Sequence, residues 1–276
     1  MKKLLFIFFT LLILAIIFIY IYYNQPTEIH TKKHKEKYIA NIIYPEDIST
    51  KYIANIIYPE DIISTKYKPT PFDKYSNDKF LTSKATKIYG NNETPIYVID
   101  NFLSDEDCEE LIADTIKRNE LVESPLTRYN PDEPNFRTSK TAMFKNNKLH
   151  NYIENKIIKQ TQIKENITET AQIQHYKVGN EFKPHWDFFD PDIDWTYLNN
   201  GQRTWTCMIY LNDVLDGGET FFTTLNQKIK PKKGSAVIWC NLFEDGTLNR
   251  ETMHAGLPIK DGEKWIITKW FLNKIS

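Results

Sequence analysis

The chain has 276 residues, with 35 basic and 36 acidic side chains and a formal net charge of −1 at pH 7. This balance argues against a protein that binds nucleic acid by neutralising many phosphates, so we expect no nucleic-acid partner. The apolar fraction of 41% is sufficient for one well-filled domain, and three cysteines (Cys108, Cys207 and Cys240) are too few for a disulfide framework. One disulfide with a free thiol and three buried thiols are both compatible with the sequence.

Residues 1–23 predict a single transmembrane helix. Lys2 and Lys3 precede an uncharged run of twenty residues from Leu4 to Tyr23. At about 1.5 Å per residue this run spans roughly 30 Å, the thickness of the hydrocarbon core of a bilayer. The run ends in bulky residues rather than the small residues of a cleavage site. An uncleaved signal anchor is therefore favoured over a cleaved signal peptide or a buried core helix.

Residues 24–94 are expected to form a stalk. Within it, residues 37–50 read KYIANIIYPEDIST and residues 51–65 read KYIANIIYPEDIIST, a tandem repeat with one inserted isoleucine. Two copies are too few for a solenoid. A duplicated spacer is favoured, and a short strand pair or a partner-binding segment is the alternative.

A folded domain is predicted over residues 95–276. It begins with a strand at Ile96–Ile99 and a helix from Asp105, capped by Ser104. The buried face of that helix is expected to carry Cys108, Leu111, Ile112 and Ile116. A loop is expected at 123–138, because this stretch is rich in proline and asparagine, and a second helix at Lys148–Gln160.

From Gln172 onward the pattern changes to short apolar runs separated by turns. The clearest runs are Thr204–Leu211, Ser235–Asn241 and Trp265–Leu272. Strands of this length and spacing are typical of barrels and jelly rolls. The sequence therefore predicts a mainly β domain with flanking helices.

His185 and Asp187 form a candidate metal site. Residues i and i+2 of a strand point to the same face, so an imidazole and a carboxylate can reach one ion, and His254 is the best candidate for a third ligand. Two histidines and one carboxylate are typical of non-haem iron(II) oxygenases, with zinc as the rival metal.

Lys264 is the candidate anion-binding residue. It alternates with Ile266, Thr268 and Trp270, so these four side chains share one face of a predicted strand. A lysine on a largely apolar face needs an anion, which a dicarboxylate cosubstrate would supply; a solvated lysine is the alternative. If a hairpin at Asp261-Gly262 joins His254 to Lys264, a two-residue loop would place them on opposite faces, and a three-residue loop or bulge on one face.

Several motifs, in order, resemble those of prolyl 4-hydroxylases over roughly residues 96–273. QHYKVGNEFKPHWDFF, residues 174–189, is similar to the first iron motif, and RTWTCMIYLNDVLDGGETFF, residues 203–222, to the central strand and Gly-Gly-x-Thr turn. Residues 231–241 and 253–271 resemble the closing motif, and residues 98–112 and 137–139 the upstream segments.

The resemblance implies a double-stranded β-helix, or jelly roll, that takes Fe(II), 2-oxoglutarate, O2 and L-ascorbate. It implies that His185, Asp187 and His254 ligate iron and that Lys264 pairs with the distal carboxylate of 2-oxoglutarate. It also implies that Tyr176 adds a hydrogen bond to that carboxylate, that Thr220 helps to line the pocket and that Trp270 packs beside the site. The position of Phe182 often holds tyrosine in relatives, so a hydroxyl contact made there is absent here.

The implied reaction is 4-hydroxylation of peptidyl proline coupled to oxidative decarboxylation of 2-oxoglutarate. Collagen-like chains are among the candidate substrates. Loops at 127–137 and 188–202 are expected to close over the substrate. The candidate contacts are Tyr129, Phe136, Trp195, Tyr197 and Arg203; ordinary loop aromatics are the alternative. The alternative functions are hydroxylation of lysine or asparagine side chains, and a catalytically inactive, membrane-tethered binding module.

The expected location is a single-pass membrane protein with its catalytic domain in the lumen of the secretory pathway. Relatives with this arrangement, and the Asn-x-Thr sequences at Asn92 and Asn166, favour the lumen. The four lysines between residues 32 and 37 favour the cytoplasm by the positive-inside rule.

Overall fold

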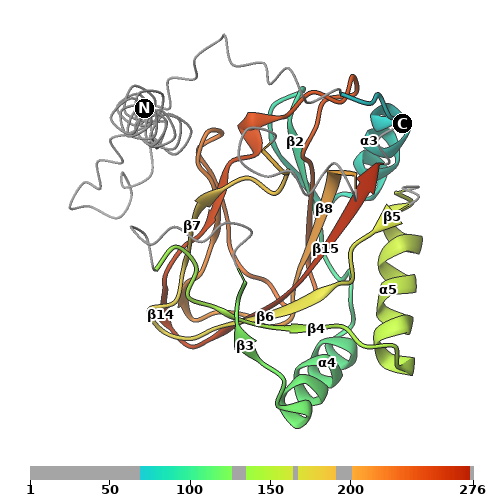
Figure 1. Cartoon of the computed structure of the whole chain (residues 1–276). Helices are drawn as coiled ribbons and strands as arrows, with labels where there is room; N and C mark the ends of the chain where they lie inside the picture. Colours follow the sequence, from blue (N-terminus) through green and yellow to red (C-terminus); the bar gives the residue numbers. More distant parts are fainter. Residues whose placement is uncertain (1–68, 126–134, 164–166, 191–200, 274–276) are drawn as a thin grey trace, which may run out of the picture. The chain divides into compact units, whose positions relative to one another are not determined.

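The computed structural model describes residues 69–125, 135–163, 167–190 and 201–273. Within these ranges the chain is mainly β, with three α-helices and one short 3-10 helix. The helices are α3 (Lys74–Lys84), α4 (Asp105–Arg118), α5 (Lys148–Thr161) and η1 (Arg250–Thr252). Figure 1 shows β7 on one side of the central strands β8 and β15, and α5 on the other.

The strands form two main sheets. The larger has nine strands, in the order β1 (Lys87–Gly90), β2 (Pro95–Ile99), β12 (Ala236–Cys240), β8 (Gln202–Tyr210), β15 (Lys264–Asn273), β6 (Gln172–Tyr176), β4 (Lys140–Met143) and β3 (Val122–Glu123), with β5 (Ile167–Thr168) also paired to β15. The smaller has the order β11 (Gln227–Ile229), β10 (Thr220–Phe222), β13 (His254–Gly256) and β7 (Phe182–His185). Strands β9 (Asp216–Gly217) and β14 (Ile259–Asp261) form a separate pair.

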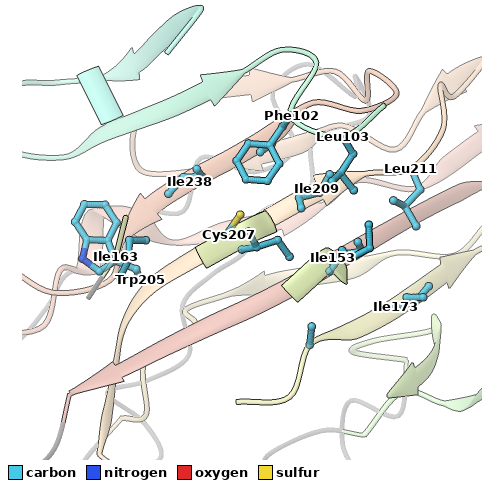
Figure 2. Close-up of a cluster of buried hydrophobic side chains, with 14 of the residues drawn as sticks. Phe102, Leu103, Ile153, Ile163, Ile173, Trp205, Cys207, Ile209, Leu211 and Ile238 are labelled. Carbon is cyan, nitrogen blue, oxygen red and sulfur yellow. The ribbon is translucent and has the colours of Figure 1, made fainter. Parts of the chain in front are cut away.

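The larger sheet is buried on both faces, and β8 shows how the sequence achieves this. Trp205, Cys207 and Ile209 belong to one apolar cluster, which also holds buried residues of α3, α4 and α5. Met208 and Tyr210, which alternate with them, belong to a second cluster shared with the smaller sheet. Since neighbouring strand residues face opposite sides, one continuous apolar run covers both layers. Figure 2 shows part of the first cluster.

Two sheets packed face to face with helices outside confirm the predicted mainly β, jelly-roll class. The strands expected around residues 96–99, 204–211, 235–241 and 265–272 and the helix at 148–160 are confirmed, with ends that differ by two residues or fewer. All three cysteines are buried free thiols, which decides between the two alternatives that the sequence left open.

The helix α4 begins as predicted and buries a different face from the expected one. Ser104 accepts from the backbone N–H of Asp107, whose carboxylate accepts from the N–H of Ser104, a complete capping box. Cys108 and Leu111 are buried, but Ile116 is 59% exposed and Thr115 is buried in its place. The prediction for Ile116 was wrong. The Thr115 hydroxyl donates a hydrogen bond to the carbonyl of Leu111 in the same helix, so Thr115 can be buried against the core without an unpaired polar group.

The fold begins before the predicted boundary at residue 95. Strand β1 pairs with β2 along its whole length, and Leu81 of α3 is fully buried in the cluster shared with α4 and α5. Residues 74–90, expected in the stalk, therefore belong to the domain. Their polar composition hid this, because α3 buries little besides Leu81 and Lys74.

The predicted anchor at residues 1–23 and the repeats at 37–65 lie outside the described residues. Among the residues that are described, no helix is both long and apolar enough to cross a membrane.

We expect Leu81→Ala to destabilise the domain by about 2–5 kcal/mol, because it removes a fully buried side chain and leaves a cavity. Urea denaturation followed by tryptophan fluorescence measures the free energy of unfolding. Leu215→Ala, at a position that is 80% exposed, is the matched control and should change it by less than about 0.5 kcal/mol. An unchanged value for Leu81→Ala would show that α3 is not part of the cooperative unit.

Candidate metal centre and its pocket

The smaller sheet brings the two histidines together. His185, the last residue of β7, is the register partner of His254, the first residue of β13. Their rings lie 4.3 Å apart between centroids. Asp187 follows β7 by two residues, and its carboxylate oxygens lie 3.8 Å from Nε2 of His185 and 3.9 Å from Nε2 of His254. One ligand atom from each residue lies within 4.8 Å of the others, as a single ion requires.

Backbone carbonyls fix which nitrogen of each imidazole faces the centre. Nδ1 of His185 lies 2.8 Å from the carbonyl oxygen of Lys183, and Nδ1 of His254 lies 2.9 Å from that of Thr252. A carbonyl only accepts, so each Nδ1 carries the proton. The lone pair of each Nε2 is therefore directed toward Asp187, the arrangement in which outer hydrogen bonds orient metal-binding histidines.

A chain of hydrogen bonds orients the carboxylate of Asp187. The Thr206 hydroxyl donates to Oδ2 of Asp187 over 2.8 Å and accepts from Nδ2 of Asn241 over 2.9 Å. The amide of Asn241 thus directs the Thr206 proton toward the carboxylate. Arg203 donates to the backbone carbonyl of Asp187, which fixes the main chain as well.

The electrostatics suit a cation. Burial, with the nearby His254, lowers the pKa of His185 to about 3, so this ring is neutral at physiological pH, as a metal ligand must be. Burial on its own would raise the pKa of Asp187, but the two histidines and Arg203 outweigh it and lower that pKa, so the carboxylate is ionised. A carboxylate between two imidazole nitrogens, enclosed by protein, is a site that suits a cation.

Lys264 lies on the opposite wall of the same pocket. It is 1% exposed, its ammonium donates to the carbonyl of Gly218 over 2.9 Å, and it lies 4.5 Å from the ring centroid of Tyr176. No carboxylate lies within ion-pair distance of it in the part of the chain that the structure describes. A buried ammonium without a carboxylate is a receptor for an anion.

His254 and Lys264 reach the pocket from different sheets. Strand β13 pairs with β7 and β10, whereas β15 pairs with β5, β6 and β8, and β14 between them pairs with β9. The two residues therefore do not lie in one ladder, and the condition on the loop between them does not apply. The Asp261-Gly262 turn leads from β14 into β15, and the two side chains meet because their sheets face each other.

The pocket collects most of the residues that the sequence singled out. Its wall includes Arg137, Gln174, Tyr176, Phe182, His185, Asp187, Met208, Thr220, Trp239, His254, Gly256, Lys264, Ile266, Thr268 and Trp270. The four alternating residues of β15, from Lys264 to Trp270, are all present, which confirms their predicted shared face. Thr220 lies within hydrogen-bond distance, 2.7 Å, of the Tyr210 hydroxyl.

Arg203 occupies a different place from the expected substrate contact. Its guanidinium forms two hydrogen bonds with Glu169, at 2.6 and 2.7 Å, and lies between the rings of Trp270 and Phe189. It does not line the pocket, and its described contacts are with the protein. The other candidates, Tyr129, Trp195 and Tyr197, lie outside the described residues.

Arg137 and Gln174 are among the pocket residues that the sequence did not predict as site residues. Arg137 lies 4.7 Å above the ring of Phe182, whose ring stacks on His185 at 3.5 Å. Gln174 lies on β6 and joins Tyr176 to Thr268 through hydrogen bonds. Gln174 could have been found from the sequence, because it precedes Tyr176 by two residues on one strand and so shares its face. Arg137 could not, because only tertiary pairing with Phe182 brings it to the site.

Comparisons with known proteins agree with this site. Residues 171–272 match the family model of the 2OG-Fe(II) oxygenase superfamily. The chain is 32% identical over 206 residues to prolyl 4-hydroxylase subunit alpha-1 of Bos taurus, covering 72% of this chain and 38% of that protein. It is 31% identical over 202 residues to Probable prolyl 4-hydroxylase 3 of Arabidopsis thaliana, covering 64% of this chain and 69% of that protein.

A solved structure shares both sequence and fold. The 2OG complex of the viral collagen prolyl hydroxylase from Paramecium Bursaria Chlorella virus-1 has 34% sequence identity and a TM-score of 0.53, covering 64% of this chain and 96% of that one. The chain spans little more than a third of the bovine subunit, so the likeness to that protein concerns this domain alone.

We expect Thr206→Val to weaken metal binding by about 10- to 100-fold, because the Asp187 carboxylate loses the donor that orients it. Titration of the apoprotein with Mn(II) or Fe(II) under anaerobic conditions measures the dissociation constant. Thr204→Val is the matched control, because Thr204 is buried on the same strand and donates to Phe271 instead. Equal metal affinities for the two variants would show that Thr206 does not support the metal site.

Proposed function

Because the chain belongs to the prolyl 4-hydroxylase family of 2-oxoglutarate- and iron(II)-dependent oxygenases, we propose that it hydroxylates C4 of peptidyl proline. The observation that carries this proposal is a pocket with a His-Asp-His cluster on one wall and a buried lysine on the other. Such a pocket fits a dicarboxylate that spans a metal and an ammonium. The reaction converts the C4–H bond, O2 and 2-oxoglutarate into the C4–OH bond, succinate and carbon dioxide.

The residues that would hold the iron are His185, Asp187 and His254. Three protein ligands leave open coordination positions, and iron(II) bound there would supply the activation of dioxygen that the reaction needs. The protein fixes the ligands before the metal arrives: carbonyls hold the imidazoles, and Thr206 and Arg203 hold Asp187. Phe182, stacked on His185, and Trp239, edge-on to His254, exclude water around the rings.

Lys264 would bind the distal carboxylate of 2-oxoglutarate, with the ring of Tyr176 beneath the ammonium. Thr220, on β10 of the smaller sheet, also offers a hydroxyl to the pocket. That hydroxyl is free to turn toward a carboxylate, since its only described acceptors are the Tyr210 hydroxyl and the weak acceptor Met208 Sδ at 3.8 Å. Trp270 lines the same pocket as Asp187, and the guanidinium of Arg203 lies over the Trp270 ring.

The proposed substrate is a proline-containing peptide in an extended conformation, collagen-like chains included. The likeness to a viral collagen prolyl hydroxylase supports this class. Arg137 and Phe136 flank Phe182 at the pocket and offer a cation and an aromatic edge to a peptide. L-Ascorbate is proposed as the reductant that restores iron oxidised without substrate turnover.

We expect the full chain, given Fe(II), ascorbate and 2-oxoglutarate, to form 4-hydroxyproline in a collagen-like or proline-rich peptide with one succinate per hydroxyl. His185→Ala should abolish both products, because it removes a ligand. Mass spectrometry of the peptide and a succinate assay measure them. His175→Gln is the control; this histidine pairs with Glu263 outside the metal cluster. Hydroxylation of lysine or asparagine peptides alone would show that the substrate residue is not proline. Succinate release unaffected by His185→Ala would refute the proposed metal site.

We expect 2-oxoglutarate binding to weaken above pH 8. Burial lowers the pKa of Lys264 to about 8, so the ammonium that pairs with the carboxylate is present below this pH and is lost as the pH rises through it. The dissociation constant of the Mn(II)-loaded protein, measured by calorimetry between pH 7 and 9.5, should rise by up to about tenfold per pH unit above 8. Lys264→Arg keeps its charge over this range and should show no such rise; a parallel rise would place the titrating group elsewhere.

We also propose that residues 1–23 anchor the protein in a membrane, with the catalytic domain in the lumen of the secretory pathway. The support is the uncharged run from Leu4 to Tyr23 and the Asn-x-Thr sequences. Deletion of residues 1–23 should release the protein from membranes at high salt, and glycosidase treatment should increase its electrophoretic mobility. Digestion of the domain by protease added to sealed vesicles would show that the domain faces the cytoplasm and would contradict the lumenal orientation.

A further inference from the structure

The sheet face that forms one wall of the pocket continues beyond the pocket. Strands β15, β6, β4 and β3 follow one another toward the edge of the larger sheet (Figure 1). Thr268, which lines the pocket, is the register partner of Gln172 on β6, and Gln172 is in turn the register partner of Met143 on β4. Register partners share a face of the sheet, so these three side chains form one row that leads out of the pocket.

The row ends in an apolar side chain that is open to solvent. Met143 is 43% exposed. Val122 on the edge strand β3 is the register partner of Thr141, two residues before Met143, so it lies on the same face, and it is 63% exposed. Single exposed apolar residues are common, and these two are informative because they adjoin the pocket.

Gln172, between Thr268 and Met143, has an unused hydrogen-bond acceptor. The residue is 8% exposed, and no donor to its Oε1 lies in the part of the chain that the structure describes. A buried acceptor without a donor is costly, so the row points to a ligand that carries an N–H group. The main chain of a peptide supplies such a donor at every residue except proline.

The length of the row matches a peptide in the polyproline II conformation. Neighbouring strands lie about 4.8 Å apart, so Met143 lies roughly 10 Å from Thr268, two strands away. In a polyproline II chain each residue rises about 3.1 Å and every third side chain points the same way, so three residues span roughly 9 Å. With the target proline in the pocket, a chain that follows this row places the residue three positions away over Met143.

We propose that Gln172 and Met143 form a second subsite for the substrate peptide. Met143 packs against an apolar side chain, best a second proline, three residues from the hydroxylated one, and Oε1 of Gln172 accepts from a main-chain N–H between the two. This inference rests on the proposed function, because the peptide is the substrate of that reaction. It favours chains in which proline recurs at every third residue, as it can in collagen-like sequences.

The test compares three synthetic peptides of equal length that share one target proline. One has a second proline three residues before the target, one has it three residues after, and one has alanine at both places. Calorimetry measures their affinity for the full chain loaded with Mn(II) and 2-oxoglutarate, without turnover. At least one of the two-proline peptides should bind about three- to tenfold more tightly than the alanine peptide.

Met143→Ser should abolish this preference, because it removes the apolar contact outside the pocket. With Fe(II), it should raise KM for the preferred peptide and leave kcat unchanged. Ile158→Ser is the matched control and should keep the preference, since Ile158 is 41% exposed and lies on α5, which packs on the opposite face of the sheet. Gln172→Leu should weaken all three peptides by a similar factor, and Met143→Ser decides the matter even if Gln172→Leu does not fold.

A preference that persists in Met143→Ser would overturn the inference, because it would come from the stiffness of the peptide. Equal affinities of the native chain for all three peptides would also overturn it. So would self-association of the native chain that Met143→Ser abolishes without a change in peptide affinity, which would assign this surface to a second copy of the chain. If the native chain binds no peptide and forms no hydroxyproline, the proposed function fails. Hydroxylation without the preference refutes the inference alone.

Discussion

Alternation along the central strands is the constraint on which both the core and the site depend. Each of β8, β12 and β15 is buried on both faces, so every residue along them must suit one of two interiors. The face toward the helices is largely apolar, as at Cys207 and Ile209, and its buried Lys269 is paired with Glu154 of α5. The opposite face holds Thr206, which donates to Asp187, and Lys264, which lines the pocket, so these polar groups lie one residue away from the apolar core.

Burial of these polar groups determines how the site is organised. A buried donor or acceptor without a partner costs free energy of roughly 1–3 kcal/mol, and the groups that orient the three ligands are paired. Asn241 orients Thr206, Thr206 orients Asp187, and backbone carbonyls orient both imidazoles. The unmet demands that remain are a cation among three ligands and an anion beside Lys264. A metal cation and a carboxylate-bearing cosubstrate are therefore the two ligands that the pocket would accept.

Arg203 illustrates how the structural environment of a residue changes the role inferred for it from the sequence. Its position directly after the predicted substrate loop at 188–202 suggested a substrate contact. In the structure its charge is neutralised by Glu169, and its guanidinium lies against the rings of Trp270 and Phe189. It supports the main chain of Asp187 instead. A guanidinium with five donors in a plane suits this role, because it can pair with a carboxylate, stack on aromatic rings and bind a carbonyl at once.

The sequence by itself determined the mainly β class with flanking helices, most strand and helix positions, the His185–Asp187 pair and the shared face of Lys264 and Trp270. These depend on periods of two or 3.6 residues and on capping groups, which are local properties of the chain. Only the tertiary structure decided that His254 and Lys264 come from different sheets, that α3 and β1 belong to the domain, and that Arg137 reaches the pocket through its pairing with Phe182. Each of these depends on which surfaces meet across the fold, and no local spacing encodes a contact between strands that pair with different partners.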